Sequence, residues 1–104
     1  MAAAFDPASY TPNRAASGLN GAIMVHQIDF ARFEKLLSAS KLASLRPRAR
    51  AIAAAKGGHA FPPKKAGPLD SGITDASWWR WLVLDACIAK YGSGGAVLEA
   101  VGCF

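Results

Sequence analysis

Residues 74–92, TDASWWRWLVLDACIAKYG, contain all three tryptophans of the chain and a run of large apolar residues from Trp81 to Leu84. Asp75 or Thr74 is placed to cap a helix at the start of this stretch, because either side chain can accept a hydrogen bond from a free backbone N–H. Lys90 suits the negative end of the helix dipole, and Gly92 permits the left-handed conformation at which many helices end. The stretch therefore predicts one helix over residues 75–91.

The apolar side chains of this helix surround nearly its whole circumference and form no single stripe. A helix that is apolar all round is normally buried by its neighbours. Each large apolar side chain that is fully buried contributes roughly 1.5–3 kcal/mol to folding. We therefore expect this Trp-rich helix to be central in the fold. The side chains that we expect to contribute to the core are Trp78, Trp81, Leu82, Asp85 and Ile88.

Two helices with one apolar face each are expected before the Trp-rich helix. The first is predicted over residues 29–40 with Asp29 as its cap, because the next apolar residues follow the i, i+3, i+4, i+7 spacing. The second is predicted over residues 44–56, where Ser44 is the expected cap and Pro47 is tolerated in the first turn. The apolar positions that support these two helices are Phe30, Phe33, Leu36 and Leu37, then Leu45, Ala49, Ile52 and Ala53.

The remaining segments contain weaker patterns. Residues 1–22 are rich in Ala, Pro, Ser, Asn and Gly without a sustained period, which predicts a flexible, mobile N-terminal arm. Residues 23–28 are expected to be an extended lead-in, and residues 96–101 a short fourth helix. The predicted fold is therefore all-α: one small domain over residues 23–104, with three to four helices around the central Trp-rich helix.

Residues 58–71, GHAFPPKKAGPLDS, are expected to form a long loop between the second helix and the Trp-rich helix. Three prolines and two glycines in this stretch exclude regular secondary structure. Phe61 is placed to hold the loop on the core by burying its ring. Uninterrupted loops of this length often carry function in compact domains.

The charge balance favours an acidic partner. Twelve Lys and Arg against seven Asp and Glu give the 104-residue chain a net charge of +5, and such a balance suits nucleic acid, an anionic membrane surface or an acidic protein. The longest apolar run is far shorter than the ~20 residues that span a bilayer. The first residues also lack the pattern of a secretory signal. We therefore expect a cytoplasmic protein that does not enter a membrane.

Five basic residues are the expected partner contacts: Arg46, Arg48, Arg50, Lys64 and Lys65. Helical spacing places Arg46 and Arg50 on one face of the second helix and Arg48 roughly opposite. Guanidinium groups can hold carboxylates or phosphates through a planar fork. The simpler interpretation, which the sequence leaves open, is a solvated helix face whose arginine stems cover apolar surface.

No group of residues in the sequence predicts catalysis. His26 and His59 have neither a nucleophile nor paired carboxylates at a recognisable spacing. Cys87 and Cys103, even with both histidines, do not form a metal-ligand pattern, and Cys87 is expected to be a small buried side chain. We therefore expect no enzyme activity, cofactor, metal or small-molecule substrate.

Asp85 separates two interpretations of the Trp-rich helix. If its face belongs to the core, the carboxylate must be paired with a cation or bonded to an indole N–H, because an unpaired buried charge is very costly. If the face is a binding patch, its Trp and Arg side chains are the anchors for a partner. The core interpretation is preferred, since three exposed tryptophans on a free monomer favour aggregation.

These features together favour a non-enzymatic protein-binding regulator or inhibitor that covers an acidic surface of a larger partner. An exposed tryptophan would then serve as its hydrophobic anchor. The alternative is weak nucleic-acid binding without sequence preference through the second helix. That alternative lacks the aromatic-rich strands of single-strand binders and a recognition helix with base-reading polar side chains.

Overall fold

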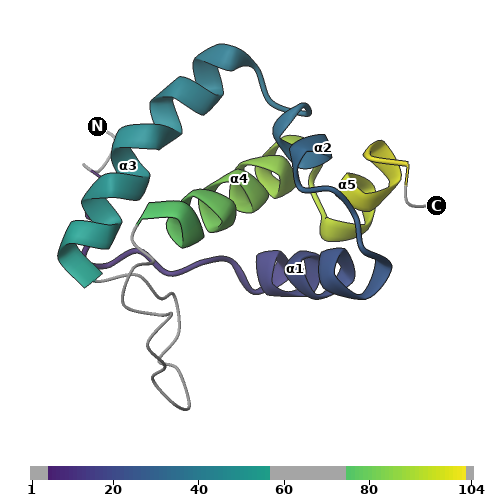
Figure 1. Ribbon diagram of the computed structural model, residues 1–104, viewed down its shortest axis with the longest axis horizontal. Helices are drawn as coiled ribbons and strands as arrows, with labels where there is room; N and C mark the ends of the chain where they lie inside the picture. Colours follow the sequence, from purple (N-terminus) through teal and green to yellow (C-terminus); the bar gives the residue numbers. More distant parts are fainter. Residues whose placement is uncertain (1–4, 57–74, 103–104) are drawn as a thin grey trace.

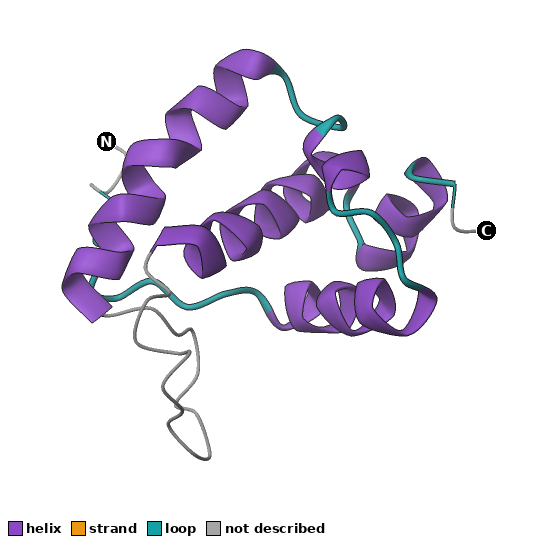
Figure 2. Cartoon of the chain, viewed as in Figure 1, coloured by secondary structure: helices purple, strands orange, loops and turns teal. Residues whose placement is uncertain are grey.

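A computed structural model describes residues 5–56 and 75–102 of the chain, and every regular element in these ranges is helical (Figures 1 and 2). The predicted all-α fold class is therefore confirmed. Five helices are present in the described ranges where three to four were predicted. They are α1 (Arg14–His26), α2 (Ala31–Glu34), α3 (Ala39–Lys56), α4 (Asp75–Tyr91) and α5 (Gly94–Ala100).

The helix α4 contacts each of the other four helices. In Figure 1 it runs between α3 and α1, with α2 and α5 near its C-terminal end. Its buried side chains point in several directions, which explains why its apolar residues are not confined to one stripe. Those buried side chains are Trp78, Leu82, Val83, Leu84, Cys87 and Ile88.

The N-terminal region differs from the prediction. Residues 14–22 belong to α1, so the expectation of an irregular arm over residues 1–22 is wrong for this part of the chain. The same helix continues to His26, which replaces most of the extended segment expected over residues 23–28. Ala16, Leu19 and Ile23 are its buried residues. Their spacing of three and four is helical, but the glycines and polar residues between them hide the pattern.

Both ends of α1 have recognisable caps. The side chain of Asn13 accepts a hydrogen bond from the backbone N–H of Ala15 at 2.8 Å. At the other end Gln27 adopts the left-handed conformation, with φ of 53°. Asparagine is a favoured first cap, whereas a left-handed residue at a helix end is usually glycine. The non-glycine stop at Gln27 is the reason that the sequence gives no end signal here.

The helix predicted over residues 29–40 is interrupted. Asp29 accepts a hydrogen bond from the backbone N–H of Ala31 at 3.1 Å, but the N-cap residue of α2 is Phe30, without a side-chain capping bond. However, α2 has only four residues, and α3 begins at Ala39. The hydroxyl of Ser38 accepts from the N–H of Lys41 at 3.1 Å, so Ser38 caps α3 in place of Ser44.

The earlier start of α3 changes the position of Pro47. This proline lies well inside the helix instead of in its first turn. A proline there has no N–H to donate to the carbonyl of Ala43, four residues earlier. The predicted inner face of α3 is nevertheless confirmed: Leu45, Ala49 and Ile52 are buried, and α3 makes extensive contact with α4.

The expected loop over residues 58–71, including Phe61, lies outside the described residues, and so do the last two residues of the chain. The expected helix over residues 96–101 is present with shifted bounds as α5, whose N-cap is Ser93. Its side chain accepts from the N–H of Ala96 at 3.1 Å. None of the helices in the described ranges has the length and apolar character needed to cross a membrane.

Candidate functional site

The helix α3 has the most one-sided charge of the five. Its sequence, ASKLASLRPRARAIAAAK, contains basic residues but no acidic residue. Because the buried stripe of α3 faces α4, the basic side chains lie on its flanks and are exposed at the three arginine positions. These positions are Arg46, Arg48 and Arg50.

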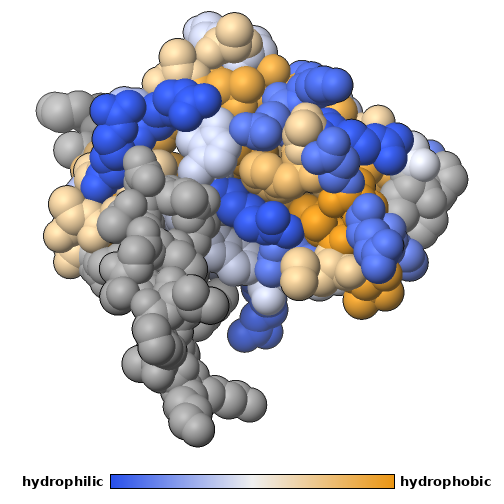
Figure 3. All heavy atoms as spheres, viewed as in Figure 1, coloured by the Kyte–Doolittle hydropathy of each residue, from blue (hydrophilic) through white to orange (hydrophobic). Residues whose placement is uncertain are grey.

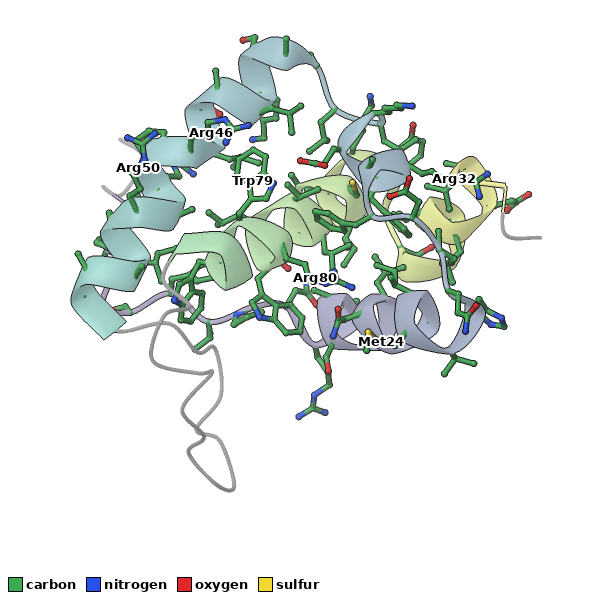
Figure 4. All side chains as sticks on the ribbon, in the orientation of Figure 1. Met24, Arg32, Arg46, Arg50, Trp79 and Arg80 are labelled. Carbon is green, nitrogen blue, oxygen red and sulfur yellow. The ribbon has the colours of Figure 1, made fainter. Side chains whose placement is uncertain are left out.

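Arg46 lies over the ring of Trp79 from α4. The guanidinium carbon is 4.5 Å from the ring centroid, which is cation–π geometry. The indole N–H of Trp79 donates to Oε2 of Glu34 at 2.9 Å, so the ring is held from a third element, α2. Figure 4 shows Arg46 between α3 and Trp79, with Arg50 on the neighbouring turn of α3.

Arg48 lies on the other side of α3 and contacts the N-terminal segment. Its guanidinium carbon is 4.8 Å from the ring centroid of Phe5. The three arginines are thus divided between two surfaces, as their helical spacing indicates. Arg46 and Arg50 are four residues apart and lie on one side of α3, and Arg46 contacts Trp79. Figure 3 shows hydrophilic side chains over α3 beside apolar surface in this view.

The arginine charges are not neutralised by neighbouring carboxylates in the part of the chain that the structure describes. Arg46 and Arg48 rest on aromatic rings. Arg80 donates from Nε to Oδ1 of Asn20 at 2.6 Å and lies 5.0 Å from the ring centroid of Phe30. Burial lowers the pKa of Arg80 below its usual range. The surface therefore retains positive charge that a partner can meet.

The environment of Asp85 corrects the sequence expectation. Its carboxylate accepts hydrogen bonds from the hydroxyl of Tyr10 and, at 3.1 Å, from the backbone N–H of Asn13. Neither partner is the cation or the indole N–H that we expected. Burial raises the pKa of Asp85, while the bonds from Tyr10 and Asn13 lower it in part. Burial and Asp85 together raise the pKa of Tyr10.

The residues expected in the core of α4 are either fully buried or only partly buried. Trp78, Leu82 and Ile88 are buried, at 0%, 5% and 8% exposure. Trp81 is only partly buried and packs against the core from its edge, and Asp85 is also partly buried. Tyr10 meets the ring of Trp78 edge-on, with ring centroids 5.9 Å apart. The N-terminal segment therefore covers this side of α4.

Sequence reasoning missed the pairing of Trp79 with Arg46. The two residues are 33 positions apart, and their contact depends on how α3 crosses α4, which no local pattern encodes. The position of Trp79 on a helix that is apolar all round gave no sign that its ring is only partly buried. The expectation of an exposed tryptophan anchor stays a prediction, and Trp79 is partly buried.

The remaining residues that the sequence singled out do not join this surface. Lys64, Lys65, His59 and Cys103 lie outside the described residues, and His26 is exposed at the end of α1. Cys87 is buried, as predicted, with Sγ 3.5 Å from the carbonyl oxygen of Phe33. Burial raises the pKa of the Cys87 thiol to about 11. No cluster of three or more His, Cys, Asp or Glu in the described ranges could hold a metal.

The chain was also compared with known proteins. No protein-family model, no curated protein and no solved structure matches it. The chemistry of the α3–α4 surface is therefore inferred from the residues of this chain alone.

Proposed function

We propose that this protein is a non-enzymatic binding protein, acting as a regulator or inhibitor, whose helix α3 contacts an acidic surface of a larger cytoplasmic protein. The observation that carries the proposal is the position of Arg46 over Trp79, with the Trp79 ring held by Glu34. Arg46 and Arg50 would meet carboxylates of the partner, and Trp79 would supply the apolar contact beside them.

Preorganisation of the arginine supports this function. A long flexible side chain normally loses about 0.5–1.5 kcal/mol when a partner immobilises it. The guanidinium of Arg46 already rests on a ring, and its planar fork leaves N–H groups for bidentate contact with a carboxylate. Less freedom therefore remains to be lost on binding.

The residue types also support a protein partner. Tryptophan and arginine are enriched among the residues that dominate binding energy at protein interfaces. The indole of Trp79 is partly exposed and lies against the exposed Arg46. A partner that covers this surface would exclude water from both groups at once, which strengthens the contact between a guanidinium and a carboxylate.

A charge-reversal pull-down tests the proposal. The double variant Arg46→Glu/Arg50→Glu is compared with wild type as bait in nuclease-treated cytosolic extract. Arg14→Glu is the matched control, because Arg14 is also exposed but begins α1. We expect the double variant to lose the partners that wild type and Arg14→Glu retain. Equal capture by all three baits would contradict the proposal.

Nucleic-acid binding is the second candidate, and the absence of acidic residues from α3 favours it. Each phosphate neutralised on duplex DNA contributes about −0.9 to the slope of log affinity against log salt. A gel-shift series starting at about 50 mM salt checks this possibility. Binding that weakens steeply with salt, together with loss of every protein partner after nuclease treatment, would replace the first proposal with this one.

A further inference from the structure

An open groove lies between the start of α3 and the second half of α4. It has a volume of about 390 Å³ and includes two lysines but no acidic side chain in its lining. Lys41 comes from α3 and Lys90 from α4, so the two helices each contribute one ammonium group. The full lining is Leu37, Ser38, Lys41, Ala86, Ala89 and Lys90.

The ammonium group of Lys90 is held in place, whereas the side chain of Lys41 is exposed. Nζ of Lys90 donates to the carbonyl oxygen of Leu36 at 2.6 Å and lies 5.6 Å from the ring centroid of Tyr91. Lys41 is in the first turn of α3, where its backbone N–H is bonded to Ser38. The positive end of the α3 dipole adds to the charge of the lysines. The groove is thus electropositive, while Leu37 and the two alanines give it an apolar side.

Trp79 does not line the groove, but it lies on the same side of α4 as two of the lining residues. Trp79, Ala86 and Lys90 are spaced by seven and four residues, which places them on one side of α4. Eleven residues of helix separate Trp79 from Lys90, a length of about 16 Å. An extended chain advances about 3.3 Å per residue, so roughly five residues span this distance.

The charge along this strip is almost all positive. Arg46 and Trp79 mark one end and Lys41 and Lys90 the other. The carboxylate of Glu34 lies at the Trp79 end, where it accepts the indole hydrogen bond. A short peptide with carboxylates at its two ends would therefore meet Lys41 and Lys90 at one end and Arg46 at the other. Glu34 lies near Arg46 and weakens the attraction at that end.

We propose that the groove seats an acidic side chain of the partner, which presents a linear segment of about five residues along the strip from Arg46 to Lys90. The carboxylate lies between the ammonium groups of Lys41 and Lys90, and a neighbouring apolar side chain contacts Leu37 and the two alanines. This inference rests on the proposed protein-binding function and adds the site and the chemistry of the segment.

The probe is a synthetic peptide, Glu-Glu-Leu-Glu-Glu, with Gln-Gln-Leu-Gln-Gln as its uncharged match. Binding to the full chain is followed by fluorescence anisotropy and by the amide NMR shifts of Ser38, Ala86 and Ala89. We expect the acidic peptide to shift these resonances and the uncharged peptide to leave them unchanged. Lys41→Ala and Lys90→Gln are expected to weaken binding about two- to fivefold each, as for exposed ion pairs.

Arg14→Ala is the matched control and should bind the peptide as wild type does. Thermal melts accompany each variant, because Lys90 also bonds Leu36. The groove proposal fails if the peptide binds without shifting the groove resonances and both lysine variants bind it normally. The proposed function is tested separately, by the charge-reversal pull-down. No binding to wild type also overturns it. A single-stranded DNA dodecamer that shifts the same resonances at lower concentration overturns it in favour of nucleic acid.

Discussion

The hydroxyl of Tyr10 donates a hydrogen bond to the carboxylate of Asp85, 75 positions later in the chain. The second oxygen of that carboxylate accepts the backbone N–H of Asn13, whose own side chain caps α1. One side chain of α4 thus holds the segment that leads into α1 and fixes the point where that helix begins.

Replacing Asp85 with alanine should destabilise the protein by about 1–3 kcal/mol, the cost of leaving partly buried hydrogen-bond donors unpaired. The cost stays below the ~3–5 kcal/mol of a broken buried ion pair, because neither partner is charged. Chemical denaturation of wild type and Asp85→Ala measures the difference. An unchanged free energy of unfolding would show that the bonds to Tyr10 and Asn13 do not stabilise the fold.

Tyr10→Phe is the complementary change, since it removes the hydroxyl and keeps the ring against Trp78. We expect a loss of about 0.5–1.5 kcal/mol. The double variant with Asp85→Ala should cost less than the sum of the single variants, because both remove the same bond. Strict additivity would mean that the two residues are not coupled in solution.

The pH dependence of stability should contain a contribution from Asp85. Its pKa is raised from an ordinary value near 3.8 by burial, so the folded state binds this proton more tightly than the unfolded chain. The favourable contribution of Asp85 to the free energy of unfolding is therefore complete at pH values below its pKa in the unfolded chain. It is lost as pH rises through its pKa in the folded protein.

We thus expect the free energy of unfolding of wild type, relative to Asp85→Asn, to be greatest near about pH 3 and to fall toward about pH 7. Urea titrations of both proteins across this range measure the trend. A relative stability that rises with pH would show that the bonds from Tyr10 and Asn13 outweigh burial.

Cys87 should resist alkylation in the folded protein. Its side chain is fully buried and its thiol pKa is raised to about 11, whereas reagents attack the exposed thiolate. In a Cys103→Ser variant, which leaves Cys87 as the single thiol, iodoacetamide should label the native protein at the rate of unfolding. The urea-unfolded variant is the control and should react rapidly. Rapid labelling of the native variant would contradict the buried position.

Pro47→Ala should stabilise the protein, because alanine restores an N–H inside α3 and is up to about 3 kcal/mol more favourable in a helix interior. Loss of the rigid proline from the unfolded chain offsets about 0.4–1 kcal/mol of this gain. A rise in Tm of several degrees is expected on thermal denaturation. Ala54→Pro, at another exposed position of α3, is the matched reverse change and should lower Tm. A lower Tm for Pro47→Ala would place Pro47 outside a regular helix.

The bounds of α4 were predictable because its signals are local: an acidic residue at the start, a high density of apolar residues, and glycine at position 92, where φ is 93°. The buried face of α3 was predictable for the same reason. By contrast, α1 was missed because its three buried residues are separated by glycine, serine and asparagine, and its stop is a left-handed glutamine. The contacts of Arg46 with Trp79 and of Tyr10 with Asp85 join distant segments, so only the packing of helices reveals them.

The contacts of α4 determine when the chain can fold. The main packing of α2 and α3 is against α4, and α1 packs against α4 and α5. During synthesis the first 56 residues therefore emerge without the surface that their apolar side chains bury. Because these helices pack against the segment from Asp75 to Tyr91, their native packing is completed only after that segment has left the ribosome.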